Sequence, residues 1–322
     1  MTTKDILLGL KPITLDCLTV FAPFYAERAK HYVYPRYMQS VCALVGFGKT
    51  YYNIVNAENG KVLAIYKRTA IFGKTGVQMP VCPISLSGSV RDELSVMSAA
   101  LKVGVSLRVT SEDIARYRIP PRLCSDGTGP FVPVNNEYIY QAQQGAEMKG
   151  AKYYKLRHKV KRVLTAEGFS LTDGAHPQAD AVVRAWDARY KKINGTQTDQ
   201  AHLWQIIKQA LVKGQTVSVR NITVGGVLQC VSVTEQISPK HYVGVFRVRN
   251  YNSTLHDVVS AMQQIDCNAC LGSDNAPVYM NRGLADTEGL IALKESLRPC
   301  RHQKIFTVKT QKTSQSLKQY FI

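Results

Sequence analysis

The second half of the sequence changes from helical to strand periodicity in an order that strongly limits the folds open to it. Apolar residues recur first at helical spacing and then at the alternating spacing of strands. The predicted elements are, in order, helices over about 177–193 and 199–212, a hairpin over 215–236 with Gly225-Gly226 at its turn, a strand over 241–249, a helix over about 253–264, a strand near 276–281, a helix over 286–296 and a strand over 304–310. Three antiparallel strands followed by alternating helices and strands predict an α+β fold with a mixed, largely antiparallel sheet.

This order is similar to that of a GNAT-type (acyl-CoA N-acyltransferase-type) domain, and the first half of the chain offers a degraded version of it. The elements expected there are a helix over 14–29 with Thr14 as N-cap, two strands joined at Glu58-Asn59-Gly60, a helix over about 90–102, and a strand leading into a short helix capped by Ser111. A loop rich in Pro and Gly over 119–136 separates the halves. We therefore predict tandem GNAT-like domains, with a degraded N-terminal domain over 1–135, a C-terminal transferase domain over 136–310 and a flexible tail over 311–322.

The charge of the chain limits its partners. An excess of 41 Lys and Arg over 23 Asp and Glu gives a net charge of +18. A surplus of this size attracts phosphate-rich partners such as tRNA, DNA or an anionic membrane surface, and charge that serves only solubility is the alternative. No signal peptide or transmembrane segment is expected, so any membrane contact would be peripheral.

The eight cysteines are scattered along the sequence. Cys267 and Cys270 form a lone C-x-x-C pair, without two further ligands at the spacing that a structural zinc needs. We therefore expect reduced thiols, no metal site and a cytoplasmic location.

Seven of the cationic residues fall within residues 149–162, a segment that contains no acid. If this segment is a helix, its apolar residues from Tyr153 to Leu164 lie on one side and its cations on another. The residues that we expect to bind phosphates there are Lys152, Lys155, Arg157, Lys159 and Arg162. Such a helix would hold a tRNA or DNA backbone with about eight contacts and a steep salt dependence. A solvated helix face is the alternative.

Two stretches carry a resemblance to a known family. NNEYIYQAQQGAEMKGAKYYKLRHKVKRVL (135–164) joins an acidic-aromatic strand to Lys-Gly-x-Lys-Tyr and a basic helix. VYMNRGLADTEGLIALKESLRPCRHQKIFTV (278–308) has a strand, Asn-x-Gly, a Gly-Leu-x-x-x-Lys helix, Pro and a final strand. Both are similar to the phosphatidylglycerol lysyltransferase C-terminal-like family, and the likeness covers roughly residues 10–308.

That resemblance implies paired GNAT-like domains related to the Fem-type peptidyltransferases. Characterised members of the family move an amino acid from aminoacyl-tRNA to a lipid hydroxyl or a peptide amine. This sequence departs from the membrane enzymes in having no expected transmembrane helix, which argues against a lipid acceptor. Leu156 and His158 stand where the family often has Lys and Asn, so the donor contacts of the basic helix are expected to differ.

A donor in a GNAT-type domain lies beside the fourth strand, near the start of the following helix. The junction here is FRVRNYNSTLHDVV, in which the expected donor-binding residues are Arg247, Arg249, Asn250 and Ser253, the last as a helix cap. Acetyl-coenzyme A enzymes usually have a glycine-containing motif at this junction, and RVRNYNST contains no glycine. The sequence thus favours aminoacyl-tRNA over acyl-CoA as donor, with no tightly bound cofactor.

The family likeness identifies Lys294 as the candidate catalytic cation, aimed at the reacting carbonyl or a phosphate, and an exposed helical lysine is the alternative. Asn281 is the second candidate catalytic residue, and it and Gly283 are expected to shape the end of the preceding strand. Glu137 and Asp286 are the candidate general bases, and the sequence does not rank them.

Three functions remain open. The first is a transferase that moves an aminoacyl or acyl group to an unknown amine or hydroxyl acceptor. The second is a GNAT-like enzyme that modifies a DNA base, as in phage-type hypermodification, and the third is a non-catalytic nucleic-acid-binding protein on the same scaffold.

Overall fold

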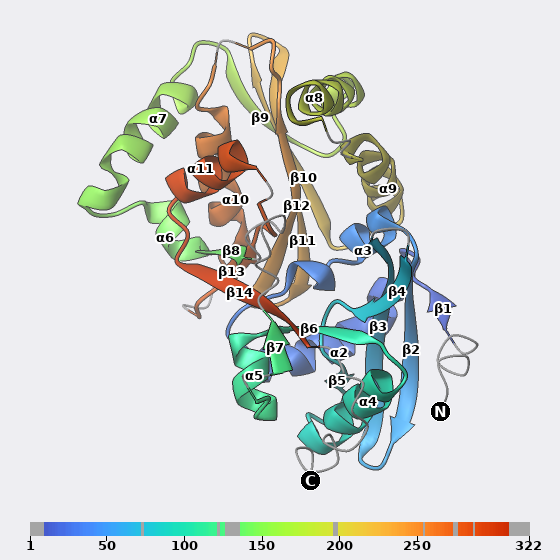
Figure 1. Cartoon of the computed structure of the whole chain (residues 1–322). Coiled ribbons are helices and arrows are strands. Elements are labelled where there is room, and N and C mark those ends of the chain that lie inside the picture. Colours follow the sequence, from blue (N-terminus) through green and yellow to red (C-terminus); the bar gives the residue numbers. More distant parts are fainter. Residues whose placement is uncertain are drawn as a thin grey trace. The chain divides into compact units, whose positions relative to one another are not determined.

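The computed structural model describes residues 10–71, 74–120, 123–125, 136–195, 199–253, 255–272, 276–285 and 287–308 (Figure 1). The chain forms two compact units: unit 1 comprises Met1–Glu137 and Gln303–Ile322, and unit 2 comprises Tyr138–His302. The final strand, which the sequence places in the second domain, therefore contributes its residues from Gln303 onward to unit 1. Asp286 and the tail 311–322 lie outside the described residues.

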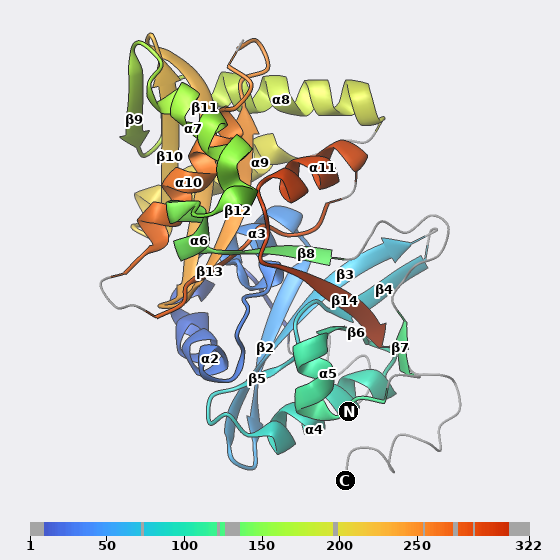
Figure 2. The same cartoon turned by 90° about the vertical axis from the view of Figure 1, so that its left-hand side faces the viewer.

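Unit 1 is built on a mixed sheet with the strand order β1-β2-β3-β4-β6-β14, in which β4 and β6 are parallel and the other neighbours antiparallel (Figure 2). Its strands are β1 (Lys11–Pro12), β2 (Thr50–Ala57), β3 (Gly60–Ile71), β4 (Lys74–Met79), β5 (Ile84–Ser85), β6 (Ser106–Thr110), β7 (Cys124–Ser125) and β14 (Arg301–Val308). Its helices are α2 (Cys17–His31), η1 (Tyr37–Gln39), α3 (Val41–Phe47), α4 (Val90–Lys102) and α5 (Ser111–Tyr117).

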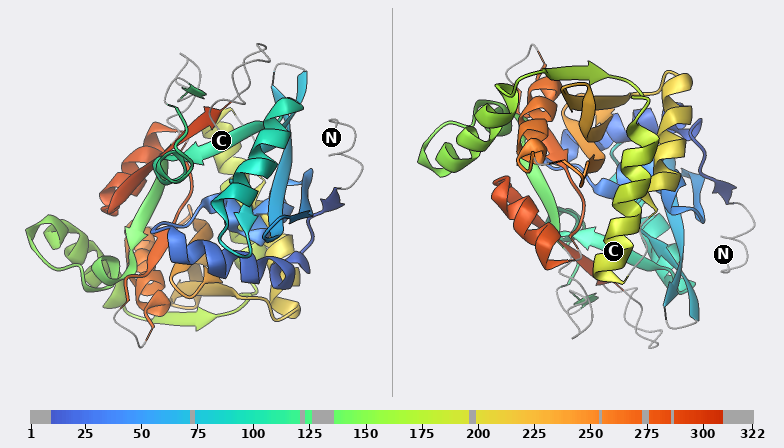
Figure 3. Two further views of the ribbon diagram at one scale, coloured as in Figure 1. Left: turned by 90° about the horizontal axis from the view of Figure 1, so that it is seen from below. Right: turned by 90° about the horizontal axis from the view of Figure 1, so that it is seen from above.

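Unit 2 has a second sheet with the order β8-β13-β12-β11-β10-β9, in which only β12 and β13 are parallel. The strands are β8 (Asn136–Gln141), β9 (Phe169–Asp173), β10 (Val217–Val224), β11 (Val227–Ser238), β12 (His241–Arg249) and β13 (Tyr279–Asn281). The helices are α6 (Ala142–Glu147), η3 (Ala151–Tyr153), α7 (Tyr154–Leu164), α8 (Ala179–Asn194), α9 (Gln200–Val212), α10 (Val258–Cys270) and α11 (Glu288–Ser296). Helices α8 and α9 lie on one face of this sheet and α10 on the other (Figure 3).

The two units repeat one arrangement. In each, three antiparallel strands lead into a helix and then into a fourth strand that runs parallel to the third. In unit 1 these elements are β2, β3, β4, α4 and β6, and in unit 2 they are β10, β11, β12, α10 and β13. The predicted α+β class and tandem arrangement are therefore confirmed.

The helix starts differ most from the prediction. Helix α2 begins at Cys17 with Asp16 as N-cap. Thr14 lies before the helix, where its carbonyl accepts from the Cys17 amide and its own amide donates to Sγ of Cys17 at 3.4 Å, so the predicted Thr14 cap is wrong. Helix α5 is capped by Thr110, with Asp113 completing a capping box, in place of Ser111. Helix α10 begins at Val258, five residues later than expected.

Apolar side chains form a separate core in each unit. In unit 1 the core gathers residues of β3, β6 and α4, among them Met97 and Leu107, which are fully buried. In unit 2 the apolar side of α7, with Leu156, Val160 and Val163, packs with α10 and the sheet. Among the described residues no helix is both long enough and apolar enough to cross a membrane.

Candidate active site at the divergence of β12 and β13

The parallel strands β12 and β13 pair over three residues and then separate. The pairs are His241 with Tyr279, Tyr242 with Met280 and Val243 with Asn281. The residue after β13 is Arg282, whose side chain lies against Gly244 of β12. A Cβ atom on Gly244 would be 2.3 Å from both Cδ and Nη1 of Arg282. Only glycine at position 244 allows Arg282 to occupy the divergence in this way.

Three arginines converge on Asp266 of α10: Arg220 of β10, Arg247 of β12 and Arg282, which follows β13. Nη2 of Arg247 and Nη2 of Arg282 donate to Oδ2 of Asp266 at 2.7 and 2.6 Å. Nη1 of Arg220 donates to Oδ1 at 3.5 Å, and the Ser232 hydroxyl donates to Oδ2 at 2.6 Å. Asp266 is fully buried, so this carboxylate fixes the position of all three guanidinium groups.

The cluster has more positive than negative charge. Arg220 also lies 4.0 Å from the exposed carboxylate of Asp173, but Arg247 and Arg282 have Asp266 as their one ion-pair partner among the described residues. Burial raises the pKa of Asp266, but Arg247 and Arg282 outweigh it and hold this pKa at about 2. The carboxylate is therefore ionised at neutral pH, and one buried positive charge remains uncompensated.

Two nitrogen atoms of the Arg282 guanidinium group have no hydrogen-bond acceptor among the described residues. Its side chain is 8% exposed, yet Nε and Nη1 are buried without a hydrogen-bond partner. A buried guanidinium nitrogen without an acceptor is costly, because the desolvation of a charged donor is not offset. An oxygen atom of a ligand in the divergence would satisfy these two donors.

Lys294 and Asn281, the two predicted catalytic residues, hold the turn that follows β13. Nζ of Lys294 donates to the carbonyls of Arg282, Gly283 and Leu284 at 2.7, 3.1 and 2.5 Å. The Asn281 side chain accepts from the Gly283 amide at 2.7 Å. Because a lysine ammonium has three donors, these carbonyls occupy it fully. In this arrangement Lys294 positions Arg282, which differs from the substrate contact that the family likeness suggests.

Of the other residues predicted at the junction after β12, Arg249 has an exposed contact, whereas Asn250 and Ser253 make local hydrogen bonds to the backbone. Arg249 lies at the end of β12, with Nη1 3.3 Å from Nδ1 of His256. Asn250 donates to the carbonyl of Leu228 at 3.0 Å and shapes the turn. Ser253 accepts from the Leu255 amide at 2.9 Å and does not cap α10, so the predicted Ser253 cap is wrong.

The N-cap of α10 is an acid that connects this helix to the basic helix. Asp257 is paired with Arg162 of α7 and lies 3.8 Å from Nζ of Lys159. A carboxylate is favoured at a helix N-terminus, where the backbone amides are positive. The start of α10 thus carries an anion of the protein itself.

The basic segment is a helix with an exposed cationic face, as predicted. Arg157 is committed internally, because its Nη1 donates to the carbonyls of Met148 and Gly150 at 2.5 and 2.9 Å. Lys152 lies 5.1 Å from the Tyr153 ring centroid, and Lys155 is exposed. An open hollow of about 460 Å³ is lined by His158, Lys159, Lys161, Arg162 and Thr165.

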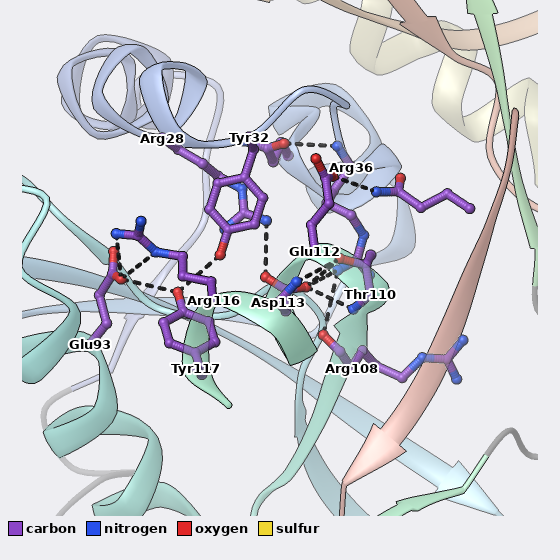
Figure 4. A network of polar contacts seen from close by, with 12 residues as sticks. Arg28, Tyr32, Arg36, Glu93, Arg108, Thr110, Glu112, Asp113, Arg116 and Tyr117 are labelled. Carbon is purple, nitrogen blue, oxygen red and sulfur yellow. Dashed lines mark hydrogen bonds and ion pairs between the residues drawn. The ribbon is translucent and has the colours of Figure 1, made fainter. Parts of the chain in front are cut away.

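The corresponding divergence in unit 1 is closed by an arginine of its own (Figure 4). Strands β4 and β6 end their pairing at Met79 and Leu107, and the next residues are Pro80 and Arg108. Arg36 donates to the carbonyls of both, at 3.1 and 3.5 Å. Its Nη1 also bonds to Asp113 at 3.4 Å and its Nε to Glu137 at 3.3 Å. Every nitrogen of Arg36 is therefore satisfied, whereas Arg282 in unit 2 keeps two donors without a partner.

The two candidate general bases, Glu137 and Asp286, are not found together at the divergence of β12 and β13 in the described part of the chain. Glu137 belongs to this closed network of unit 1, and Asp286 is not among the described residues. Sequence reasoning missed Arg282, Asp266 and Arg220. A signal for them was present, since Gly244 interrupts a strand and Asp266 is the one charged residue of its helix.

Neither protein-family models nor curated proteins match the sequence. Solved structures do match over nearly the whole chain. A conserved protein of unknown function from Bacteroides thetaiotaomicron is 16% identical with a TM-score of 0.69, covering 94% of this chain and 99% of that one. FemX is 8% identical with a TM-score of 0.64, covering 94% and 97%. L-PGS from Bacillus licheniformis is 12% identical with a TM-score of 0.60, covering 97% and 96%.

A tandem GNAT protein from the clavulanic acid biosynthesis pathway also matches, with a TM-score of 0.51 over 93% of this chain at 11% identity. Identities this low establish the fold and leave the chemistry to the residues described above. The chain has the tandem GNAT-like fold that its resemblance to the phosphatidylglycerol lysyltransferase C-terminal-like family predicts.

Proposed function

We propose that unit 2 is an acyltransferase domain that moves an aminoacyl group from an ester donor to an amine or hydroxyl acceptor. The observation that carries this proposal is the pair of buried, unpartnered nitrogens of Arg282 at the divergence of β12 and β13. When the acceptor attacks an ester carbonyl, negative charge develops on the carbonyl oxygen. Fixed donors that meet this charge lower the barrier, and a guanidinium already held by Asp266 needs little reorganisation.

The bonds and protons of the reaction balance without a protein nucleophile. The acceptor nitrogen or oxygen forms a bond to the carbonyl carbon and loses its proton. The ester C–O bond breaks, and the leaving hydroxyl of the donor takes up a proton. Asp266 stays ionised throughout, because its pKa lies far below neutrality.

Aminoacyl-tRNA is the donor that we propose, with acyl-CoA as the less favoured choice. In GNAT-type domains that use acyl-CoA, phosphates bind near the start of the helix that α10 represents. Here Asp257 stands at that position, so a carboxylate of the protein, paired with Arg162, already occupies the start of the helix. The exposed cations of α7 next to it are suited to a nucleic-acid backbone.

The test is transfer from tRNA charged with a radiolabelled amino acid to a panel of amine and hydroxyl acceptors. Arg282→Gln removes the charge and is expected to slow transfer by about 100-fold or more. Arg91→Gln, at an exposed arginine of unit 1 whose side chain is 78% exposed, removes an equal charge and is expected to leave the rate unchanged. An Arg282→Gln protein that melts normally and transfers at the wild-type rate would refute the proposal.

A further inference from the structure

The turn after β12 carries an unusual pair of cations on one aromatic ring. The guanidinium carbon of Arg249 lies 4.7 Å from the ring centroid of Tyr251, and that of Arg189 from α8 lies 4.5 Å from the same centroid. Arg189 is exposed, and Tyr251 is partly exposed. We call Arg189, Tyr251 and Arg249 the arginine–tyrosine clamp.

The clamp has no anion of its own. In the described parts of the chain neither Arg189 nor Arg249 has a carboxylate partner, and the neighbour of Arg249 is His256, at 3.3 Å. Lys208 of α9, by contrast, is paired with Asp180 of α8 at 3.0 Å. Two guanidinium groups held on one ring repel each other unless an anion joins them. A phosphate would neutralise them, and the flat faces of Tyr and Arg are suited to a base.

We propose that the arginine–tyrosine clamp binds a nucleotide, with its phosphate held by the guanidinium groups and its base stacked on the planar side chains. The inference rests on the proposed function, because the clamp would bind the nucleotide end of the aminoacyl donor. Gly244 and Arg249 lie on the same strand, so the clamp is roughly 15 Å along β12 from the divergence. An acyl group at Arg282 and a nucleotide at the clamp would therefore lie along one strand.

A nucleotide phosphate of this kind occurs both at the 3′ end of an RNA and in coenzyme A. Binding is measured by fluorescence anisotropy with a labelled single-stranded RNA of about six nucleotides and, separately, by calorimetry with coenzyme A. A base of any sequence can stack on an aromatic ring, so Tyr251→Ala is expected to weaken binding by about 5- to 100-fold. Tyr251→Phe retains the ring and is expected to leave the affinity unchanged. Arg189→Gln is expected to lower the salt slope by about one phosphate contact.

Arg184→Gln is the matched control, because Arg184 is an exposed arginine of the same helix, where its Nε donates to the Asp180 carbonyl at 3.2 Å. Equal affinity of wild type, Tyr251→Ala and Arg189→Gln for both ligands, or no binding of either ligand at low salt, would overturn the clamp. Clamp-dependent binding of RNA supports the tRNA donor, and clamp-dependent binding of coenzyme A alone keeps the clamp but assigns it to an acyl-CoA. Aminoacyl transfer that is insensitive to Tyr251→Ala would support the proposed function and overturn the clamp. RNA binding that depends on the clamp, without any aminoacyl transfer, would support the clamp and overturn the proposed function.

Discussion

The guanidinium of Arg282 occupies the space that a side chain on Gly244 would fill, so these two residues are matched across the divergence of β12 and β13. Gly244→Ala would force Arg282 off Asp266 and is expected to destabilise the protein by about 1–3 kcal/mol and to abolish transfer. In an Arg282→Ala background the same substitution should cost little, because the clashing atoms are gone. Urea unfolding of the four proteins of this double-mutant cycle measures the coupling.

Gly289→Ala on α11 serves as the control for that cycle, because a Cβ there would meet nothing within 4 Å. It is expected to leave stability unchanged or raise it by up to about 1 kcal/mol. A Gly244→Ala protein that is as stable and active as wild type would show that Arg282 does not need its observed position.

Asp266 makes the stability of unit 2 depend on pH in a defined range. Its folded-state pKa of about 2 lies below the ordinary value of 3.8, so the carboxylate stabilises the folded state above about pH 4. That contribution, about 2 kcal/mol, is lost as the pH falls from about 4 to 2. Asp266→Asn is expected to destabilise the protein at pH 7 by about 3–5 kcal/mol, since three arginines lose their shared anion. Thermal melting from pH 2 to 7 should show a flatter acid limb for the variant.

Lys294→Ala tests whether this lysine positions or contacts the reacting groups. It leaves the carbonyls of Arg282, Gly283 and Leu284 without their donor, so a loss of about 2–4 kcal/mol in the free energy of unfolding is expected. The exposed Lys155→Ala should leave that free energy unchanged. A fully stable Lys294→Ala protein with a strongly reduced turnover number and an unchanged KM would instead assign Lys294 to the substrate.

The sequence was sufficient for the fold because the long elements have strong periodicity. Segments such as α8, α9 and β11 bury a continuous apolar side, so each reads as helix or strand without tertiary information. Strand β9 was missed, since it lies at the sheet edge with four of its five residues exposed, and its apolar–polar alternation covers only Phe169 to Thr172. The start of α10 was misplaced, because Asn250 and Ser253 make local bonds to backbone amides that compete with a helix.

The site was only partly predictable, since its residues come from distant elements. Lys294 and Arg247 stand in local patterns that a sequence displays. The convergence of Arg220, Arg247 and Arg282 on Asp266 joins two strands, the segment after β13 and a helix, and no local pattern encodes it. The role of Arg36 could not be predicted from sequence for the same reason, because its partners at the divergence of β4 and β6 lie more than 40 residues away.

The salt dependence of RNA binding should reveal which cations of α7 face a ligand. Arg157 and Arg162 are committed to carbonyls and to Asp257, so fewer cations are available than the eight contacts that the sequence suggests. Lys155→Gln and Lys161→Gln together should reduce the slope of log affinity against log salt by about 1.4–1.8, depending on whether the bound strand is single or double. Arg157→Gln removes one charge from the same helix, yet it should change mainly the melting temperature, because its guanidinium holds the turn before α7. Fluorescence anisotropy with a tRNA at several salt concentrations measures all three proteins, and equal slopes for the lysine double variant and wild type would mean that the basic face of α7 is only solvated.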